Sequence, residues 1–148
     1  MATPAEVLSA LQAQLQNSAN LSYVKDENIF IGARDGITFF PCICIEREEM
    51  NESEYAYPVA RLTMVVQLII LIKTEQKDYQ LIGDGTNVKG TLDVENDVKL
   101  AIDSDRTLGG EAIHTEIQDS QDGVQEYPVR SVNLRLSILF QQTRSVRT

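Results

Sequence analysis

The sequence predicts an α+β domain: a mainly antiparallel sheet with a long central strand or hairpin and two helices packed on one face. Three observations predict it. Apolar residues recur at helical spacing near the N-terminus and again around 94–102, long stretches in 58–73 and 131–140 alternate as strands do, and turn-forming residues separate these segments. With 148 residues, one domain is expected, spanning 1–140 and followed by a polar, basic, mobile tail at 141–148.

The first helix has a clear start. Thr3 is an N-cap residue, Pro4 fits the first helical position, and Glu6 is placed to close a capping box. The helix is predicted to run to about Asn17, with an apolar stripe formed by Val7, Leu8, Leu11 and Leu15.

Two strands and a loop are expected next. Ile29–Gly32 and Ile37–Ile45 have strand character, and the turn-forming residues 33–36 between them predict a hairpin. The acidic stretch Glu46–Glu54 has few apolar residues and no helix or strand period, which predicts an exposed loop.

The segment Pro58–Lys73 is predicted to be one very long strand. Its first half is amphipathic, and its second half is apolar on both sides. At ~3.3 Å per residue it would span about 50 Å, so part of it is expected to leave the domain or to cross the sheet centre after a bend. For its two-sided apolar part, Gln67–Ile72, two interpretations stay open: a central strand covered on both faces, or a contact between subunits.

The second half contributes a helix and two strands. A loop over 73–87 leads to a helix that begins at Thr91 and ends at Asp103–Asp105. A strand is predicted around Ala112–Gln118, then a turn through 121–123, then a last strand that alternates cleanly to Phe140.

Composition excludes several functional classes. The net charge of -9 argues against tight binding of nucleic acid, although an acidic channel would let DNA slide past without sticking. The N-terminus lacks a signal-peptide pattern, which predicts synthesis inside the cell, and no apolar run reaches the ~20 residues of a membrane helix. Cys42 and Cys44 are predicted to be buried thiols, because side chains two apart in a strand are poorly placed to bond each other.

No assembled active site is evident, so an enzyme, a cofactor and a metal site are not expected. Asp103–Thr107 resembles the opening of an EF-hand loop, but Leu108 occupies the position that needs glycine. Residues 85–91 resemble a phosphate loop only in their glycines, since the lysine is missing. His114 is the only histidine, and Cys42-Ile43-Cys44 lacks a second ligand pair.

The layout resembles the tail-terminator, or tail-completion, proteins of long-tailed bacteriophages. The resemblance covers nearly the whole chain and rests on the order of the elements. It is carried by the short N-terminal helix, the segment Phe39–Ile45, the acidic stretch, the long strand Arg61–Ile72, the helix Val94–Ile102, the corner Asp105–Gly110 and the closing strand Tyr127–Phe140.

The resemblance implies a structural virion protein of the tail or neck, assembled in the host cytoplasm. Such a subunit forms a hexameric ring at the head-proximal end of the tail tube, stops tube polymerisation and joins the tail to the head connector. Its implied partners are copies of itself, the tail tube protein and the connector protein, while DNA passes through the ring without specific binding and no membrane is involved.

Three groups of residues are candidates for these contacts. A lumen or docking loop is predicted at Glu48, Glu49, Glu52 and Glu54, a subunit interface at Gln67, Ile69 and Leu71, and a partner-contacting tail at Arg144 and Arg147. Two alternatives remain: another ring subunit of a phage tail or contractile injection machine (tube or baseplate), or a soluble module that binds a small apolar ligand against the sheet.

Overall fold

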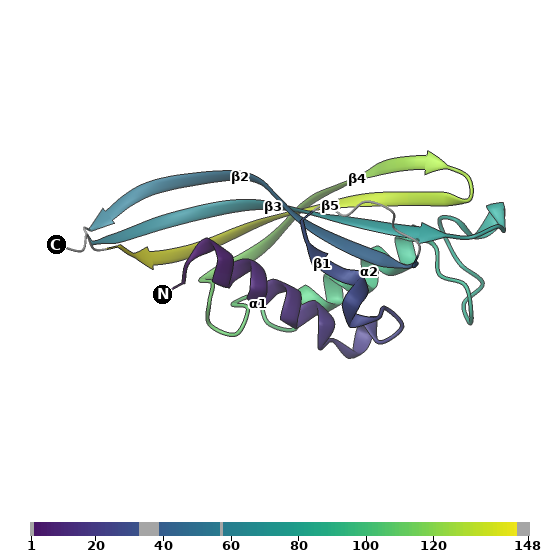
Figure 1. The fold of residues 1–148 in the computed structure, drawn as a ribbon, viewed down its shortest axis with the longest axis horizontal. Helices are drawn as coiled ribbons and strands as arrows, with labels where there is room; N and C mark the ends of the chain where they lie inside the picture. Colours follow the sequence, from purple (N-terminus) through teal and green to yellow (C-terminus); the bar gives the residue numbers. More distant parts are fainter. Residues whose placement is uncertain (1, 33–38, 57, 145–148) are drawn as a thin grey trace.

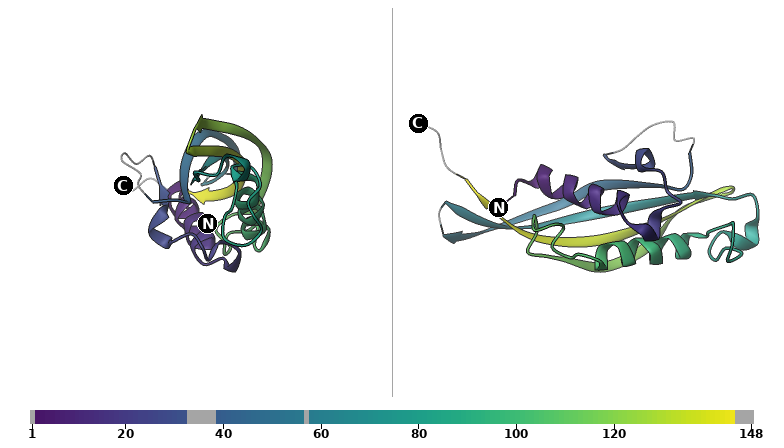
Figure 2. Two further views of the ribbon diagram at one scale, coloured as in Figure 1. Left: turned by 90° about the vertical axis from the view of Figure 1, so that its right-hand side faces the viewer. Right: turned by 90° about the horizontal axis from the view of Figure 1, so that it is seen from below.

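The computed structural model describes residues 2–32, 39–56 and 58–144. One five-stranded sheet, in the order β1-β2-β3-β5-β4, lies behind two helices that pack on the same face (Figures 1 and 2). The helices are α1, Pro4–Gln16, and α2, Thr91–Asp103, and the strands are β1, Ile29–Ile31, β2, Cys42–Ala56, β3, Val59–Lys73, β4, His114–Glu126, and β5, Val129–Thr143. The predicted α+β class with two helices on one face is therefore confirmed.

Both helices form for local reasons. The predicted capping box closes α1, because the Thr3 hydroxyl accepts from the Glu6 N–H while the Glu6 carboxylate accepts from the Thr3 N–H. At α2 the N-cap is Gly90, and the Asp93 carboxylate accepts from the N–H groups of Gly83 and Gly90 at 2.6 and 2.9 Å. Asp93 thus joins the preceding loop to the helix start.

The core lies between the helices and one face of the sheet. Alternate residues of the two central strands are buried there, as are the apolar stripes of both helices. The largest fully buried members include Leu11, Leu15, Met64, Leu68, Ile70, Leu134 and Phe140. We call this side of the sheet the helix face, and the opposite side the outer face.

The long strand does not leave the domain. All 15 residues of β3 pair with β5, and the strand also pairs with β2 along most of its length, so it is the central strand. Its pattern of alternate burial holds up to Lys73, which confirms the strand but not the bend that its length suggested.

The prediction of a loop for the acidic stretch is wrong. Residues 46–54 belong to β2 and pair with β3, from Glu46 opposite Gln67 to Glu54 opposite Ala60. The prediction fails because a bulge between Arg47 and Glu49 interrupts the alternation of faces, and because pairing with an apolar central strand overrides the low strand propensity of glutamate.

The predicted hairpin and one predicted turn are also wrong. β1 pairs with β2 in parallel, so these two strands do not form the expected antiparallel hairpin, and β2 begins only at Cys42. The predicted turn at 33–36 lies outside the described residues. Residues 121–123 lie inside β4, whose register shifts between Asp122 and Gln125, and the turn to β5 falls at Tyr127–Pro128. The sheet also extends beyond the predicted boundary at 140, since β5 continues to Thr143.

Candidate assembly surfaces

Two long strand edges of the sheet are open in the described part of the chain. β4 forms one border along all 13 of its residues. At the other border β1 covers only Ile43, Cys44 and Ile45 of β2, so β2 is unpaired on that side from Glu46 onward. Open edges present N–H and C=O groups that can pair with another strand.

The sequence pattern does not identify β2 or β4 as an edge strand, although both strands are rich in charged residues. The pattern predicts a loop for most of β2, and it predicts a strand for only the first part of β4. Charged residues on an edge strand are a common protection against indiscriminate pairing. A long polar stretch next to a clearly alternating strand is the signal that could have indicated these edges.

A polar row crosses the outer face of the sheet near its middle. It consists of Glu46, Gln67, Arg135 and Asp119, which are register partners on β2, β3, β5 and β4. The Arg135 guanidinium lies 3.2 Å from the carboxylate of Glu48, the residue at the β2 bulge, and 3.9 Å from that of Asp119. Arg135 therefore links the acidic groups of both open edges.

The four predicted lumen or docking acids do not form one cluster. Glu48 points to the outer face and pairs with Arg135, whereas Glu52 pairs with Arg144. Glu49 lies opposite Val65 and is exposed. Glu54 belongs to β2, but its side chain is outside the described part of the structure.

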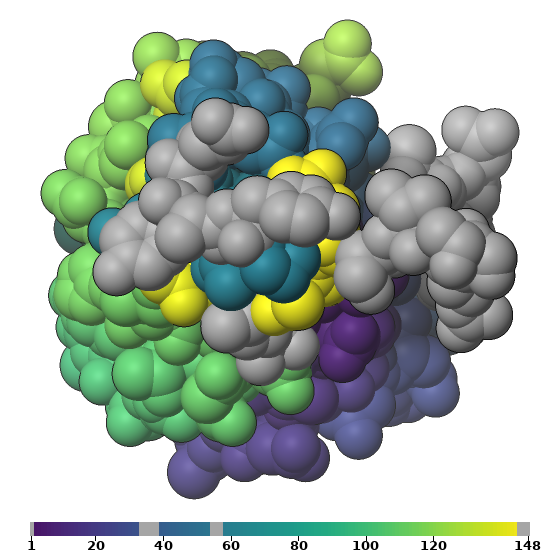
Figure 3. Space-filling view, turned by 90° about the vertical axis from the view of Figure 1, so that its left-hand side faces the viewer, coloured from purple at the N-terminus to yellow at the C-terminus, as the bar shows by residue number. Residues whose placement is uncertain are grey.

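The ion pair of Glu52 and Arg144 joins the predicted docking loop to the predicted partner-contacting tail, which the sequence predicts as separate sites. Arg144 directly follows β5, and its N–H donates to the Pro58 carbonyl at 2.8 Å, next to the tip of the β2–β3 hairpin. Figure 3 looks onto this end of the molecule, where β2 and β5 end and β3 begins, beside the start of α1. Arg147, the other predicted tail contact, lies outside the described residues.

The predicted interface residues Gln67, Ile69 and Leu71 lie on the outer face of β3. Ile69 and Leu71 are half-buried, because they pack against a small second cluster formed by Phe30, Cys42 and Cys44. β1 thus covers part of this face, and both cysteines are buried as predicted. The use of these three positions as a subunit interface stays a prediction.

The first of the two candidate ligand loops uses its carboxylates internally. Asp105 accepts from the hydroxyl and N–H of Thr107 and from the N–H of Gly109, and these hydrogen bonds hold its pKa below the usual value. Asp103 pairs with Arg106 at 2.7 Å. The segment is therefore built as the C-terminal turn of α2.

The glycine-containing loop before α2 is organised in the same way. One oxygen of Asp84 accepts from the N–H groups of Val88, Thr86 and Asn87 at 3.0, 2.8 and 2.9 Å. The hydrogen bond from Val88 is the largest of the causes that lower the pKa of Asp84 to about 2. A carboxylate of the chain thus takes the N–H groups that a bound phosphate would need.

Among residues 2–32, 39–56 and 58–144, no three histidine, cysteine or acidic side chains are placed to hold a metal ion. His114 is exposed at the start of β4, opposite Leu139. None of the described helices is long and apolar enough to cross a membrane.

A cavity of about 360 Å³ opens beside the loop before α2, and its wall includes Ile72, the last residue of the apolar stretch that suggested a ligand module. Tyr23 and Lys89 form part of its wall. The Tyr23 hydroxyl donates to Asp97 at 2.6 Å, and the Lys89 ammonium lies 3.1 Å from Asp97 and 4.4 Å from the centre of the Tyr23 ring. Burial, followed by this hydrogen bond, raises the pKa of Tyr23. Tyr23, Lys89 and Asp97 thus bind one another, and their contacts hold the loop on the domain.

Comparison with known proteins identifies a fold but not a family. No protein-family model matches the sequence, and no curated protein matches it either. Among solved structures, the chain is similar to one described as belonging to the "virion of native gene transfer agent (GTA) particle". The two share 12% sequence identity with a TM-score of 0.63, over 92% of this chain and 98% of the other. The similarity therefore extends over nearly the whole of both chains and shows a common fold.

Proposed function

We propose that this chain is a structural virion protein that forms a hexameric ring at the head-proximal end of a phage tail tube. There it ends tube polymerisation and joins the tail to the head connector. The observation that carries the proposal is the pair of long open edges, β2 and β4, on opposite borders of one sheet. A subunit with two different edges can pair head to tail with copies of itself, and such pairing closes into a ring when the rotation fits.

The shared fold supports this proposal. The similar solved chain is part of a gene transfer agent virion and has nearly the same extent as this one. A component of an assembled particle needs surfaces for copies and neighbours more than it needs a reactive site. The proposal therefore assigns this chain no catalysis and no cofactor.

In the proposed ring the outer face lines the channel and the helices lie outside. The outer face carries an excess of acidic side chains, whose charge is partly neutralised where Arg135 meets Glu48 and Asp119. Its described acids include Glu46, Glu48, Glu49, Glu116 and Asp119. Such a lining repels phosphate, so DNA passes without being held.

The docking surface for a neighbouring tail or connector protein is proposed at the end of the molecule that carries Glu52 and Arg144. Both side chains are about half-exposed and already paired. A charged side chain of a partner protein could replace either Glu52 or Arg144 in this ion pair. Arg147, three residues further along, is proposed to contribute to the same surface.

The proposal is tested by assembly of the purified protein. Light scattering should give the mass of six copies, negative-stain images should show rings, and the protein should bind one end of purified tail tubes. When added to polymerising tube protein it should also shorten the tubes. A stable monomer that neither forms rings nor binds tube ends would overturn the proposal.

The same experiment separates a terminator from a tube or baseplate subunit. A tube subunit would incorporate along the whole length of the tube, and a baseplate subunit would bind the end distal to the head. Gold labelling of the protein on tubes of known polarity distinguishes these outcomes, because only a terminator labels the head-proximal end alone.

A further inference from the structure

Arg47 is the only arginine or lysine on the two open edges. β2, with the sequence CICIEREEMNESEYA, contains this single basic residue, and β4, with the sequence HTEIQDSQDGVQE, contains none. Both strands otherwise carry several acids. Two edges of like charge repel each other when they are brought together, so any favourable charge contact between them must involve Arg47.

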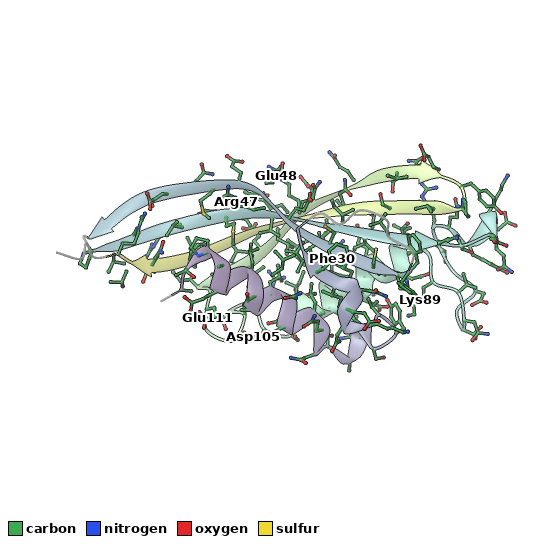
Figure 4. All side chains as sticks on the ribbon, viewed as in Figure 1. Phe30, Arg47, Glu48, Lys89, Asp105 and Glu111 are labelled. Atoms are coloured by element: carbon green, nitrogen blue, oxygen red, sulfur yellow. The ribbon has the colours of Figure 1, made fainter. Side chains whose placement is uncertain are left out.

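Arg47 projects from the helix face of the edge. Its register partner is Val66, which is fully buried on that face, whereas the neighbouring Glu48 reaches Arg135 on the outer face. Figure 4 labels Arg47 and Glu48 on β2 near the middle of the sheet. The Arg47 side chain is exposed, and it forms no ion pair with any residue that the structure describes.

Only one acid of β4 lies on the same face. Asp122 is the partner of the buried Val132, and Ser120 that of the buried Leu134, which places both on the helix face. Glu116 and Asp119, by contrast, are opposite Ser137 and Arg135 of the outer face. The Asp122 side chain is 48% exposed and has only a long 3.8 Å contact to Arg130, so it can accept a second cation.

The strand directions permit this contact. β2 is antiparallel to β3, β3 to β5 and β5 to β4, so β2 and β4 run in opposite directions. A copy that is rotated about an axis inclined to the strands therefore presents its β4 antiparallel to β2. The inclination is required because, by the registers within one copy, Arg47 is level with Ile117 and Asp122 is level with Ile43, so the neighbouring β4 must be displaced by about four residues along the strands to bring Asp122 beside Arg47. Side chains on the same face of an antiparallel pair are neighbours, whereas those on opposite faces cannot meet.

Building on the proposed function, we propose that β2 of one copy pairs with β4 of the next and that Arg47 contacts Asp122 across this junction. The partner at this edge is thus a second copy of the chain. The ion pair selects β4 over other strands and sets the register, because it is the attractive charge contact between otherwise acidic edges.

The test is a charge reversal in both positions. Arg47→Glu and Asp122→Arg are each expected to raise the protein concentration needed for half-assembly by about tenfold or more, since each places like charges together. In the double variant R47E/D122R the two charges are exchanged, so the attraction between positions 47 and 122 is restored. It should assemble within about threefold of the wild type, measured by sedimentation velocity and light scattering.

Matched controls separate this contact from general charge effects. Lys25→Glu changes an exposed charge outside the two edge strands and should leave assembly unchanged. Glu116→Arg alters the same edge on the other face, so R47E/E116R should not restore assembly. Asp122→Asn tests the loss of charge alone, and far-UV circular dichroism with urea unfolding confirms that each variant is folded.

The outcomes distinguish the two proposals. Absence of rings and of tube binding in the wild-type protein would contradict the proposed function itself. Wild-type rings that form equally well with folded R47E would contradict only the Arg47–Asp122 contact. Rescue of R47E by E116R in place of D122R would contradict the pairing on the helix face.

Discussion

The side chain of Gln14, on α1, forms its hydrogen bonds with the C-terminal end of the other helix, α2. The Gln14 side-chain amide donates to the carbonyls of Ala101, Ile102 and Asp105 at 2.9, 3.3 and 2.9 Å. The last carbonyls of a helix have no partner within the helix, and α2 has no basic residue in its final turn. Gln14 thus caps α2 from a distance and joins the two helices.

Gln14→Met should therefore destabilise the domain by about 1–2 kcal/mol, because methionine keeps the shape but removes the donor from part-buried carbonyls. Urea unfolding followed by circular dichroism measures this change. Ser9→Ala, an exposed position on the same helix, is the control and should change stability by less than about 0.5 kcal/mol. Equal effects of the two variants would show that Gln14 is not a cap.

Asp84 gives a pH-dependent contribution whose sign follows from its lowered pKa. The folded value of about 2 lies below the ordinary value of 3.8, so the folded state favours the charged form. The stabilisation is fully present above about pH 4 and is lost as the pH falls towards about 2.

The difference in unfolding midpoint between wild type and Asp84→Asn should consequently reach its full value by about pH 5 and should shrink at about pH 3 and below. Urea titrations at several pH values provide the measurement. The comparison variant is Asp26→Asn, which neutralises an exposed acid outside this loop. A difference for Asp84→Asn that stays constant over this whole pH range would contradict the assigned hydrogen bonds.

At the level of elements, two bulges explain why the edge strands are hard to identify from the sequence. β2 carries a bulge at Glu48 and β4 carries one between Ile117 and Asp119. Each bulge shifts the following residues to the other face, so a search for strict alternation fails on both strands. The two bulges flank the same polar row, at the level of Arg135.

The ion pairs of Arg135 should contribute little to stability despite their central place. The side chains of Arg135, Glu48 and Asp119 are 36%, 43% and 54% exposed, and exposed pairs are screened by water. Arg135→Met should thus lower the free energy of unfolding by less than about 1 kcal/mol. A loss above about 2 kcal/mol in urea unfolding would show that the row is structural, in which case its role in lining a channel would lose support.

Considered as a whole, the molecule has one main core and one lightly covered sheet face. The helices bury the helix face of the central strands, whereas on the outer face Phe30, Cys42 and Cys44 form a small cluster with Ile69 and Leu71. This asymmetry predicts that mutations on the two faces of the sheet have unequal effects on stability.

Leu68→Ala, on the helix face, should cost about 2–5 kcal/mol, because a fully buried leucine leaves a cavity when truncated. Leu71→Ala, three residues along β3 on the half-buried outer face, should cost clearly less in the isolated subunit. Thermal and urea unfolding of both variants at low protein concentration makes the comparison. Equal losses would show that the outer face is as fully packed as the helix face.

Local chemistry in the sequence determined the two helices, the central strands β3 and β5, and the burial of the two cysteines. Helix capping and strand alternation depend on residues that are close in the sequence. The capping roles of Thr3, Pro4 and Glu6 could therefore be predicted from the sequence, as could the alternation of Val132–Phe140.

Only the tertiary structure decided which strands lie at the borders of the sheet and which charges share a face. Edge position depends on the strand order, and the faces of Arg47 and Asp122 depend on register and bulges set by the neighbouring strands. Glutamate-rich residues 46–54 become a strand because β3 supplies their partners. Pairing between segments distant in sequence is a property of the folded chain, and no local pattern encodes it.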